Sequence, residues 1–326
     1  MTRSESNRAV FTIATGKPIY LIMACALARS FKLWHPDSDI RFILATDAAR
    51  DALPKDLRDL EIIPIQAGQY GKGFSPKLHL DKIAPAARSL FVDADCLCVG
   101  RLDIAFESFQ GHPVSVIGRE ISDGAWFGDV ATVCRKFNVP AMPKFNGGVY
   151  YLEKGEICDR VYQTARELEP HYDEIGFTRL RGHPNDELLV SLAMAIHGQK
   201  PIPEKGDIMN SLLAGPGGVE IDVFKGNTLL KNPKGHPKHN PWYELEQMRP
   251  KLVHFLGTDI ASYPYRQEQI RLRLVLEKNW PVWVATFWSK FTFSWLWLVR
   301  ERFKGLLRPI YHKMFGPRAV QNSSRC

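Results

Sequence analysis

The chain has 326 residues, which is long enough for one large domain or two with an ample hydrophobic core. Its hydrophobic content of 45% and charged content of 24% are ordinary for a globular protein. The net charge of +8 is uneven, because residues 278–318 carry eight Lys or Arg against one acid, Glu301, a local net of +7. The remaining net of about +1 argues against a nucleic-acid enzyme, which would spread positive charge over its working face.

The N-terminal residues and the cysteines bear on the cellular compartment. Residues 1–8 are polar and charged, without the apolar core of a signal peptide, so none is expected. The six cysteines include no CxxC pair, which disfavours structural zinc and a disulfide framework. Both observations favour a reducing cytoplasm.

The first part of the chain alternates between strand-like and helix-like segments. Strands are predicted at residues 10–14, 40–44 and 61–65, and helices at residues 20–31 and 51–60. Pro18 suits the first turn of the first helix, and Pro64 confines the third strand to an edge. The alternation predicts an α/β sheet with helices on its faces, in which ligands bind beyond the carboxyl ends of the strands.

Two carboxylates follow the buried strand predicted at residues 90–92. Asp93 and Asp95 lie two residues apart, so on an extended chain their side chains point the same way. A divalent cation would relieve their repulsion. A pair of turn aspartates is the plainer alternative, and Asp37 and Asp39 form such a pair in a predicted loop.

Two further segments place polar side chains near predicted ligand-binding backbone. Lys77 begins a helix after a glycine-containing loop, where it could meet an anionic ligand, although a solvated lysine is the alternative. Asn146 precedes Gly147 and Gly148, which permit close approach of the backbone to a ligand. A glycine bulge with a structural asparagine is the alternative there.

The later chain adds a carboxylate and two groups of histidines. Either Asn185 or Asp186 caps a predicted helix, and capping is the commoner role for such an aspartate. His254 ends a buried strand at residues 251–254, and an imidazole joining two carboxylates suits Mn²⁺ better than Mg²⁺. His236 and His239 are interpreted as a solvated basic loop, because no carboxylate or cysteine accompanies them.

The motifs in this order resemble glycosyltransferase family 8, a group of nucleotide-sugar transferases with the GT-A fold. The matching segments are residues 11–15 (Phe-Thr-Ile-Ala-Thr) with Tyr20, Lys77 before residues 91–95 (Phe-Val-Asp-Ala-Asp), residues 145–149 (Phe-Asn-Gly-Gly-Val), residues 185–187 (Asn-Asp-Glu) and residues 254–257 (His-Phe-Leu-Gly). The resemblance covers residues 9–258. It implies a GT-A-type, Rossmann-like mixed sheet flanked by helices.

The resemblance also implies roles for individual residues. Asp93, Asp95 and His254 would hold Mn²⁺ or Mg²⁺ against the diphosphate of a UDP-sugar, and Lys77, Asn146 and Asp186 would act at the sugar. The donor-binding residues implied are Thr12, Ala14, Thr15, Tyr20, Lys77, Asp93, Ala94 and Gly257.

One feature departs from the family pattern. The family continues after its His-Phe-x-Gly segment to a lysine that clamps the diphosphate, and this chain has none, which leaves Arg266 as a substitute or the donor held differently.

The predicted function is a metal-dependent transfer of a hexose from a UDP-sugar to an acceptor, with retention of configuration. None of the matching positions offers a strong base, so front-side attack assisted by the leaving phosphate is expected, with Asp186 stabilising an oxocarbenium-like centre. One alternative is a sugar-phosphate nucleotidyltransferase, which needs a glycine-rich basic loop where only Gly16 and Lys17 are present. Another is a non-catalytic, membrane-peripheral protein on a transferase fold.

The C-terminal segment predicts a second region. We divide the chain into a catalytic domain, residues 1–270, and a basic aromatic tail, residues 271–326. Five of the eight tryptophans lie in residues 279–299, and Trp favours the membrane–water interface. Lys290 would lie near mid-bilayer in a spanning helix, at a cost of roughly 3 kcal/mol.

The tail is therefore expected to hold the enzyme on the anionic inner face of the cytoplasmic membrane, near a lipid-linked or polysaccharide acceptor. The alternative is an aromatic helix packed on the catalytic domain or on a second subunit. Its packing stripe would comprise Trp283, Phe287, Phe291, Trp295 and Leu298.

Overall fold

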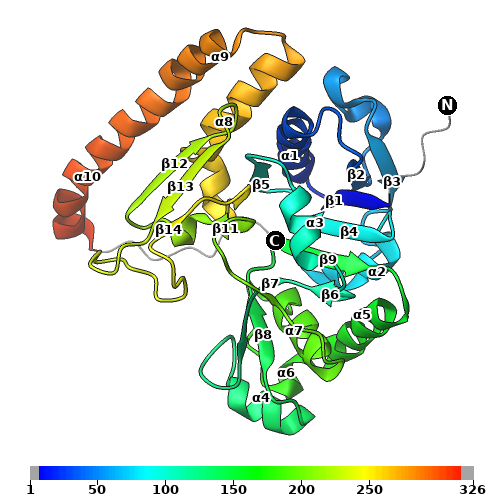
Figure 1. Cartoon of the computed structure of the whole chain (residues 1–326). Coiled ribbons are helices and arrows are strands. Elements are labelled where there is room, and N and C mark those ends of the chain that lie inside the picture. The colour runs from blue at the N-terminus through cyan, green and yellow to red at the C-terminus, as the bar shows by residue number, and fades with distance from the viewer. Residues whose placement is uncertain (1–6, 317–326) are drawn as a thin grey trace, which may run out of the picture.

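The computed structural model describes residues 7–316, so most of the N-terminal polar segment and Arg318 of the basic tail lie outside the described residues. The largest sheet of the described residues has six strands, which run from blue to green on the right of Figure 1. In spatial order its strands are β3 (Glu61–Pro64), β2 (Arg41–Thr46), β1 (Arg8–Ala14), β4 (Arg88–Val92), β9 (Val149–Glu153) and β6 (Val114–Ser115). The first four are parallel, and β9 is antiparallel to both of its neighbours. The predicted mixed α/β sheet is confirmed.

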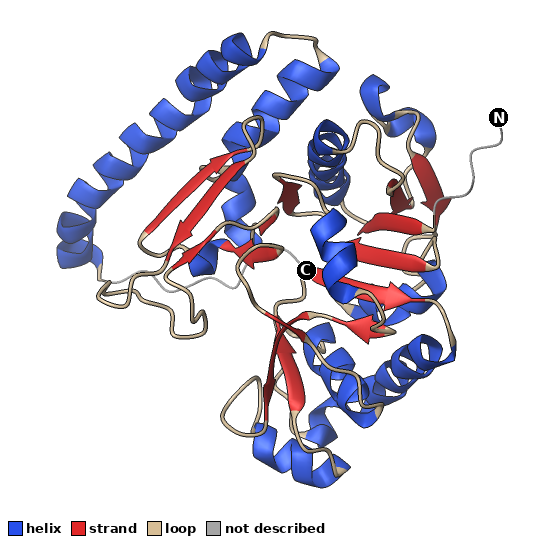
Figure 2. Ribbon diagram, viewed as in Figure 1, coloured by secondary structure: helices blue, strands red, loops and turns tan. Residues whose placement is uncertain are grey.

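Both faces of this sheet are covered, because its strands are apolar on both sides. Val10 and Leu44 pack with α1 (Pro18–Trp34), which begins at a proline as predicted. Phe11 and Ile43 pack on the opposite face with α5 (Glu156–Leu168) and α7 (Asp186–Ile196). Figure 2 shows these helices on the two sides of the strands. The carboxyl ends of the central strands are left for a ligand.

Three small sheets extend the core. One contains β10 (Ile202–Pro203), β7 (Ile117–Ile121) and β8 (Met142–Phe145). Another contains β11 (Met209–Ser211), β15 (Leu252–His254) and β5 (Cys96–Cys98). The last is an antiparallel sheet of β12 (Gly218–Asp222), β13 (Asn227–Lys231) and β14 (Gln247–Met248). Because β15 pairs with β5, the segment that ends at His254 lies beside the segment that follows Asp95.

Short helices connect these strands, and the last three of them follow β15. They are η1 (Arg50–Ala52), η2 (Lys55–Leu57), η3 (Ser75–His79), α2 (Leu80–Ile83), α3 (Asp103–Phe109), α4 (Val130–Phe137), η4 (Glu169–His171), α6 (Tyr172–Ile175), η5 (Leu212–Ala214), η6 (Gly257–Ala261), α8 (Tyr265–Leu272) and the π-helical η7 (Arg273–Glu277). The helix predicted at residues 51–60 is wrong. Pro54 lies between η1 and η2, and a proline inside a helix lacks the amide hydrogen that the helix needs.

The C-terminal segment forms α9 (Val282–Ser289), the π-helical η8 (Lys290–Trp295) and α10 (Leu296–Phe315). Its small side chains face α8: Ala285, Ser289 and Ser294 are buried, and the Ser294 hydroxyl donates a hydrogen bond to Gln267. The boundary that we placed after residue 270 falls inside α8. None of the helices within residues 7–316 has both the length and the apolar character needed to cross a bilayer.

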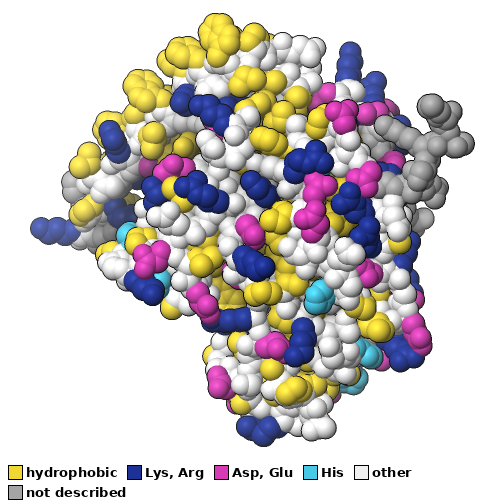
Figure 3. Space-filling model, viewed as in Figure 1, with side chains coloured by type: hydrophobic (Ala, Val, Ile, Leu, Met, Phe, Trp, Pro, Cys, Tyr) yellow, Lys and Arg dark blue, Asp and Glu magenta, His cyan; other side chains and the backbone are white. Residues whose placement is uncertain are grey.

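The residues that we call the aromatic stripe point away from the body. They are Trp283, Phe287, Phe291, Trp295 and Leu298, and all are exposed, Trp283 by 75%. Phe287, Phe291 and Trp295 stack ring on ring along the helix. Hydrophobic side chains gather over this region at the upper edge of Figure 3. The stripe is therefore not packed on the catalytic domain of its own chain.

Candidate active site

The turn after β4 brings its two carboxylates to His254. Because β15 pairs antiparallel with β5, His254 lies opposite Cys96, the residue that follows Asp95 in the sequence. The imidazole Nε2 lies 3.1 Å from Asp95 Oδ1 and 3.7 Å from Asp93 Oδ2. Two backbone hydrogen bonds fix the turn, from Asp93 N to Gly148 O and from Phe255 N to Asp95 O. The structure thus brings the three predicted metal ligands together.

The donor set fits a divalent cation that accepts oxygen and nitrogen. His254 Nδ1 lies 2.6 Å from Asn146 Oδ1, which accepts a hydrogen bond from Nδ1 and so turns Nε2 toward the carboxylates. Burial opposes the imidazolium, but Asp95 and Asp93 outweigh it and raise the pKa of His254. The two carboxylates thus favour a positive charge beside them, and a bound metal ion would supply it.

Cys96 lies close enough to Asp95 and His254 to be a third ligand by distance alone. Burial, followed by the Asp95 and Asp93 charges, raises the pKa of the Cys96 thiol well above its usual value. A neutral thiol is a poor metal ligand. Asp93, whose Oδ2 lies 3.7 Å from His254 Nε2, is the other carboxylate beside the imidazole.

Lys77 lies inside the site and not on the solvated surface. It comes from η3, and its Nζ donates to Asp93 Oδ2 at 2.7 Å and to Gly147 O at 2.9 Å. Nζ is also 3.7 Å from Asp186 Oδ2. Burial opposes the ammonium charge, but the Asp186 and Asp93 carboxylates outweigh it and raise the pKa of Lys77. The solvated-lysine alternative is wrong.

The start of α7 shows which of Asn185 and Asp186 caps the helix. Asn185 is the helix cap, because its Oδ1 accepts a hydrogen bond from Glu187 N at 3.1 Å. Asp186, in the first turn, is buried and accepts a hydrogen bond from the Tyr150 hydroxyl. Asp186 is thereby free of the capping role and directed toward Lys77.

Glycines allow these groups to approach one another. A Cβ on Gly148 would lie 2.5 Å from His254 Nδ1, and one on Gly147 would lie 3.0 Å from Glu187 Cγ. Glu187 Oε1 accepts a hydrogen bond from Gly147 N at 2.6 Å. Burial and the neighbouring Asp186 raise the pKa of Glu187 to about 7. Sequence reasoning included Glu187 in the segment of residues 185–187 without giving it a role, and it did not single out Tyr150.

The residues implied for the nucleoside lie at the end of β1. Thr12 and Ala14 are enclosed in the sheet, and the Thr12 hydroxyl has no hydrogen-bond partner within the described chain. Thr15 and Tyr20 are partly exposed beyond them. Sequence reasoning missed Asp47, whose Oδ2 accepts a hydrogen bond from Gly16 N at 2.8 Å and fixes this loop.

The remaining residues of the predicted donor site lie around the metal ligands. Ala94 is buried between the two carboxylates, and Gly257 begins η6, three residues after His254. Arg266, the proposed substitute for the missing lysine, is an exposed residue of α8 whose guanidinium donates to Gln269 of the same helix.

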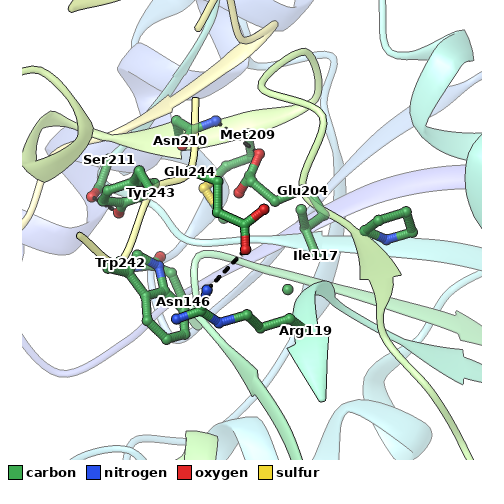
Figure 4. A pocket seen from close by; sticks show the side chains of 12 residues that line it. Ile117, Arg119, Asn146, Glu204, Met209, Asn210, Ser211, Trp242, Tyr243 and Glu244 are labelled. Carbon is green, nitrogen blue, oxygen red and sulfur yellow. Dashed lines mark hydrogen bonds and ion pairs between the residues drawn. The ribbon is translucent and has the colours of Figure 1, made fainter. Parts of the chain in front are cut away.

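A pocket of about 130 Å³ opens beside Asn146 (Figure 4). Glu204 and Asn210 lie in its lining, and Asn210 Nδ2 donates to Glu204 Oε1 at 3.0 Å. Asn210 is 1% exposed, and its Oδ1 has no hydrogen-bond partner within residues 7–316. Burial raises the pKa of Glu204. An unused buried acceptor beside a carboxylate is suited to a ligand hydroxyl.

The other side of this pocket carries an aromatic ring close to two cations. Trp242 lies between β13 and β14, with Lys144 Nζ 4.1 Å and Arg119 Cζ 4.9 Å from its ring centroid. Arg119 Nη1 also lies 3.1 Å from Glu244 Oε1, the contact drawn as a dashed line in Figure 4. Sequence reasoning missed this pocket, because its residues come from five separate segments of the chain.

The sheet order, the paired aspartates after β4 and the antiparallel β9 define the GT-A fold of nucleotide-sugar glycosyltransferases. Galactosyltransferase LgtC, solved in complex with donor and acceptor sugar analogues, shares this fold with a TM-score of 0.51 and 13% identity, over 83% of this chain and 95% of that chain. The resemblance inferred from the motifs is confirmed at the level of the fold.

A second solved structure has a lower score. Mouse xyloside xylosyltransferase 1 aligns with a TM-score of 0.45 and 14% identity, over 76% of this chain and 97% of that chain. No protein-family model matches the sequence, and no curated protein matches it.

Proposed function

We propose that the protein is a metal-dependent glycosyltransferase that moves a hexose from a UDP-sugar to an acceptor, with retention of configuration. The observation that carries the proposal is the convergence of Asp93, Asp95 and His254, with the His254 tautomer set by Asn146. A bound Mn²⁺ or Mg²⁺ would neutralise charge on the leaving diphosphate. The GT-A fold supports this assignment.

The side chains around the metal ligands suit a front-side reaction. Asp186 is held by Tyr150 and Lys77, so it is positioned to stabilise positive charge on the sugar ring. The bond from the anomeric carbon to the phosphate oxygen breaks, and its electron pair stays on the diphosphate. The acceptor oxygen bonds to the same face of that carbon, and its proton passes to the leaving phosphate oxygen.

The pocket beside Asn146 is the proposed acceptor site. Trp242 offers an aromatic face to a sugar ring, and Glu204 and Asn210 offer hydrogen-bond acceptors to its hydroxyls. The acceptor proposed is a lipid-linked saccharide or a growing polysaccharide.

The aromatic stripe and the basic residues after it support a location on the inner face of the cytoplasmic membrane. Trp283, Phe287, Phe291 and Trp295 are exposed on one side of the helices, and Arg300, Arg302, Lys304 and Arg308 are exposed beyond them. Exposed tryptophans next to cations suit the interface of an anionic bilayer.

A panel of UDP-sugars tests the proposal. Hydrolysis or transfer of one UDP-sugar in Mn²⁺, lost in EDTA and restored by Mn²⁺, is the expected result. Release of pyrophosphate from UTP and a sugar phosphate would instead identify a nucleotidyltransferase. Absence of any turnover and of UDP binding would leave a non-catalytic protein on this fold.

A further inference from the structure

The cations of the candidate site are already matched by carboxylates. Lys77 is the positive partner of Asp93 and lies near Asp186 and Glu187. A divalent ion would be shared between Asp93, Asp95 and His254. A nucleoside diphosphate would bring at least two more negative charges, so it needs another cation at the rim of the site.

The segment that follows His254 does not provide that cation. Residues 255–265 contain no lysine or arginine, and η6 contributes the carboxylate Asp259 instead. Asp259 is close enough to the site for His254 and Asp95 to affect its ionisation, but burial is the larger effect and raises the pKa of Asp259. The first basic residue after it, Arg266, is hydrogen-bonded to Gln269 along α8.

Arg181 brings a guanidinium to this segment from another part of the chain. Its Nη2 would lie 3.2 Å from a Cβ at Gly257, and within residues 7–316 no other heavy atom lies within 4 Å of that position apart from Gly257 and its chain neighbours. Arg181 is an exposed residue, so its guanidinium can reach a ligand that enters from solvent. Gly257 therefore leaves the space that the guanidinium uses.

The backbone around Arg181 is shaped to hold it there. Leu180 and His183 exchange two backbone hydrogen bonds of 2.9 and 3.0 Å, which close a tight turn just before Asn185 and Asp186. Arg181 has a φ of 53°, a left-handed conformation uncommon for a residue with a Cβ. The His183 ring packs on Gly73, so the turn spans from the loop before Lys77 to Gly257.

We propose that Arg181 is a donor-binding residue that contacts the diphosphate of the nucleotide sugar and stabilises the negative charge left on it when the glycosidic bond breaks. The inference rests on the proposed function, because it requires a nucleoside-diphosphate donor. A guanidinium can donate two parallel hydrogen bonds to phosphate oxygens, so an arginine orients the phosphate more strictly than a lysine at the same place would.

The test compares phosphate-dependent with phosphate-independent binding in the full chain. UDP and uridine are titrated into wild type, Arg181→Gln and Arg181→Lys in saturating Mn²⁺, by calorimetry or by ligand-observed NMR for the weaker binder. Arg181→Gln is expected to weaken UDP binding by about tenfold to a hundredfold and to leave uridine binding unchanged. Arg181→Lys is expected to recover part of the UDP affinity.

Arg179 provides the matched control. It lies two residues away, is exposed, and pairs with Asp173 at 2.7 Å, so Arg179→Gln should bind UDP like wild type. Wild-type affinity for UDP in Arg181→Gln would overturn the inference while leaving the proposed function intact. Equal loss of UDP and uridine binding, or loss in Arg179→Gln as large as in Arg181→Gln, would also overturn it. A wild-type protein that binds no UDP would remove both proposals together.

Discussion

His254 Nδ1 and Asn146 Oδ1 are 2.6 Å apart, and this contact decides which nitrogen of the imidazole faces Asp93 and Asp95. Such outer contacts of a ligand histidine orient the ring, and their loss typically lowers metal affinity by about 10- to 100-fold. We expect Asn146→Ala to lose Mn²⁺ affinity in that range and Asn146→Asp, which keeps the acceptor, to lose less. Titration of the metal-free protein with Mn²⁺ measures both, and unchanged affinity in Asn146→Ala would contradict the assigned role.

The two Asp-x-Asp pairs offer an internal comparison. Asp95→Ala removes a proposed ligand and should abolish Mn²⁺-dependent turnover. The double variant Asp37→Ala/Asp39→Ala should retain it, because Asp39 is exposed and pairs with Arg8. Arg8 is the first residue of β1, and the candidate site lies beyond the other end of that strand. Turnover is measured against Mn²⁺ concentration, and equal loss in the two variants would show that Asp95 acts through stability alone.

Removal of Lys77 should affect both stability and catalysis. Asp93 and Asp186 would lose their common cation, and an unpaired buried charge typically costs about 3 kcal/mol. In EDTA, Lys77→Ala should therefore lower the free energy of unfolding by about that amount, and Mn²⁺ should restore part of it. Because Lys77 also balances charge beside the leaving group, kcat should fall by about 10² with a modest loss of UDP affinity.

Lys82→Ala is the matched control for Lys77→Ala. Lys82 lies in α2, its side chain is 57% exposed, and it pairs with Asp81 at 3.4 Å. Its replacement should change neither the urea midpoint nor kcat appreciably. A Lys77→Ala protein with wild-type stability in EDTA would mean that Asp93 and Asp186 are not in charge contact with Lys77.

Glu187 should make metal-free stability depend on pH. Its pKa in the folded protein is about 7, above its ordinary value of 4.5, so the folded chain retains a proton that the unfolded chain has lost. The free energy of unfolding should therefore fall as pH rises from about 4.5 to about 7. In Glu187→Gln the free energy of unfolding should change less over this pH interval, so relative to wild type the variant should be more stable at pH 8 than at pH 4.5. Urea unfolding in EDTA at several pH values measures it, with the exposed Glu107→Gln as control, and an unchanged slope would contradict the prediction.

The aromatic stripe predicts vesicle binding. A variant with Trp283, Phe287, Phe291 and Trp295 all changed to serine should fold, because these side chains are exposed. Wild type should float with anionic vesicles in low salt, and the variant should remain in the dense fraction. A wild type that does not float but elutes as a dimer, and a variant that elutes as a monomer, would assign the stripe to a second copy of the chain.

The sequence predicted the features that lie within one short segment, and it did not predict contacts between segments that are distant in the chain. Continuous apolar runs predicted β1, β4 and β15, and Asp93 and Asp95 were placed at a strand end because β4 is buried on both faces. The hydrogen bond between Asn146 and His254 could not be predicted, since it requires the start of β9 and the end of β15 to lie beside the same turn. The same holds for the approach of Arg181 to Gly257 and for the pocket at Glu204 and Trp242, whose members are distant in sequence.

Gly148 carries a consequence for how this chain tolerates mutation. Because a methyl group there would lie 2.5 Å from His254 Nδ1, replacement by alanine should displace the imidazole, although Gly148 is not itself a proposed metal ligand. In a mutational scan scored by activity, position 148 should therefore behave like a metal-ligand position. A second change that restores activity would have to keep His254 and shift the backbone of β15, rather than arise among the neighbours of Gly148 in the sequence.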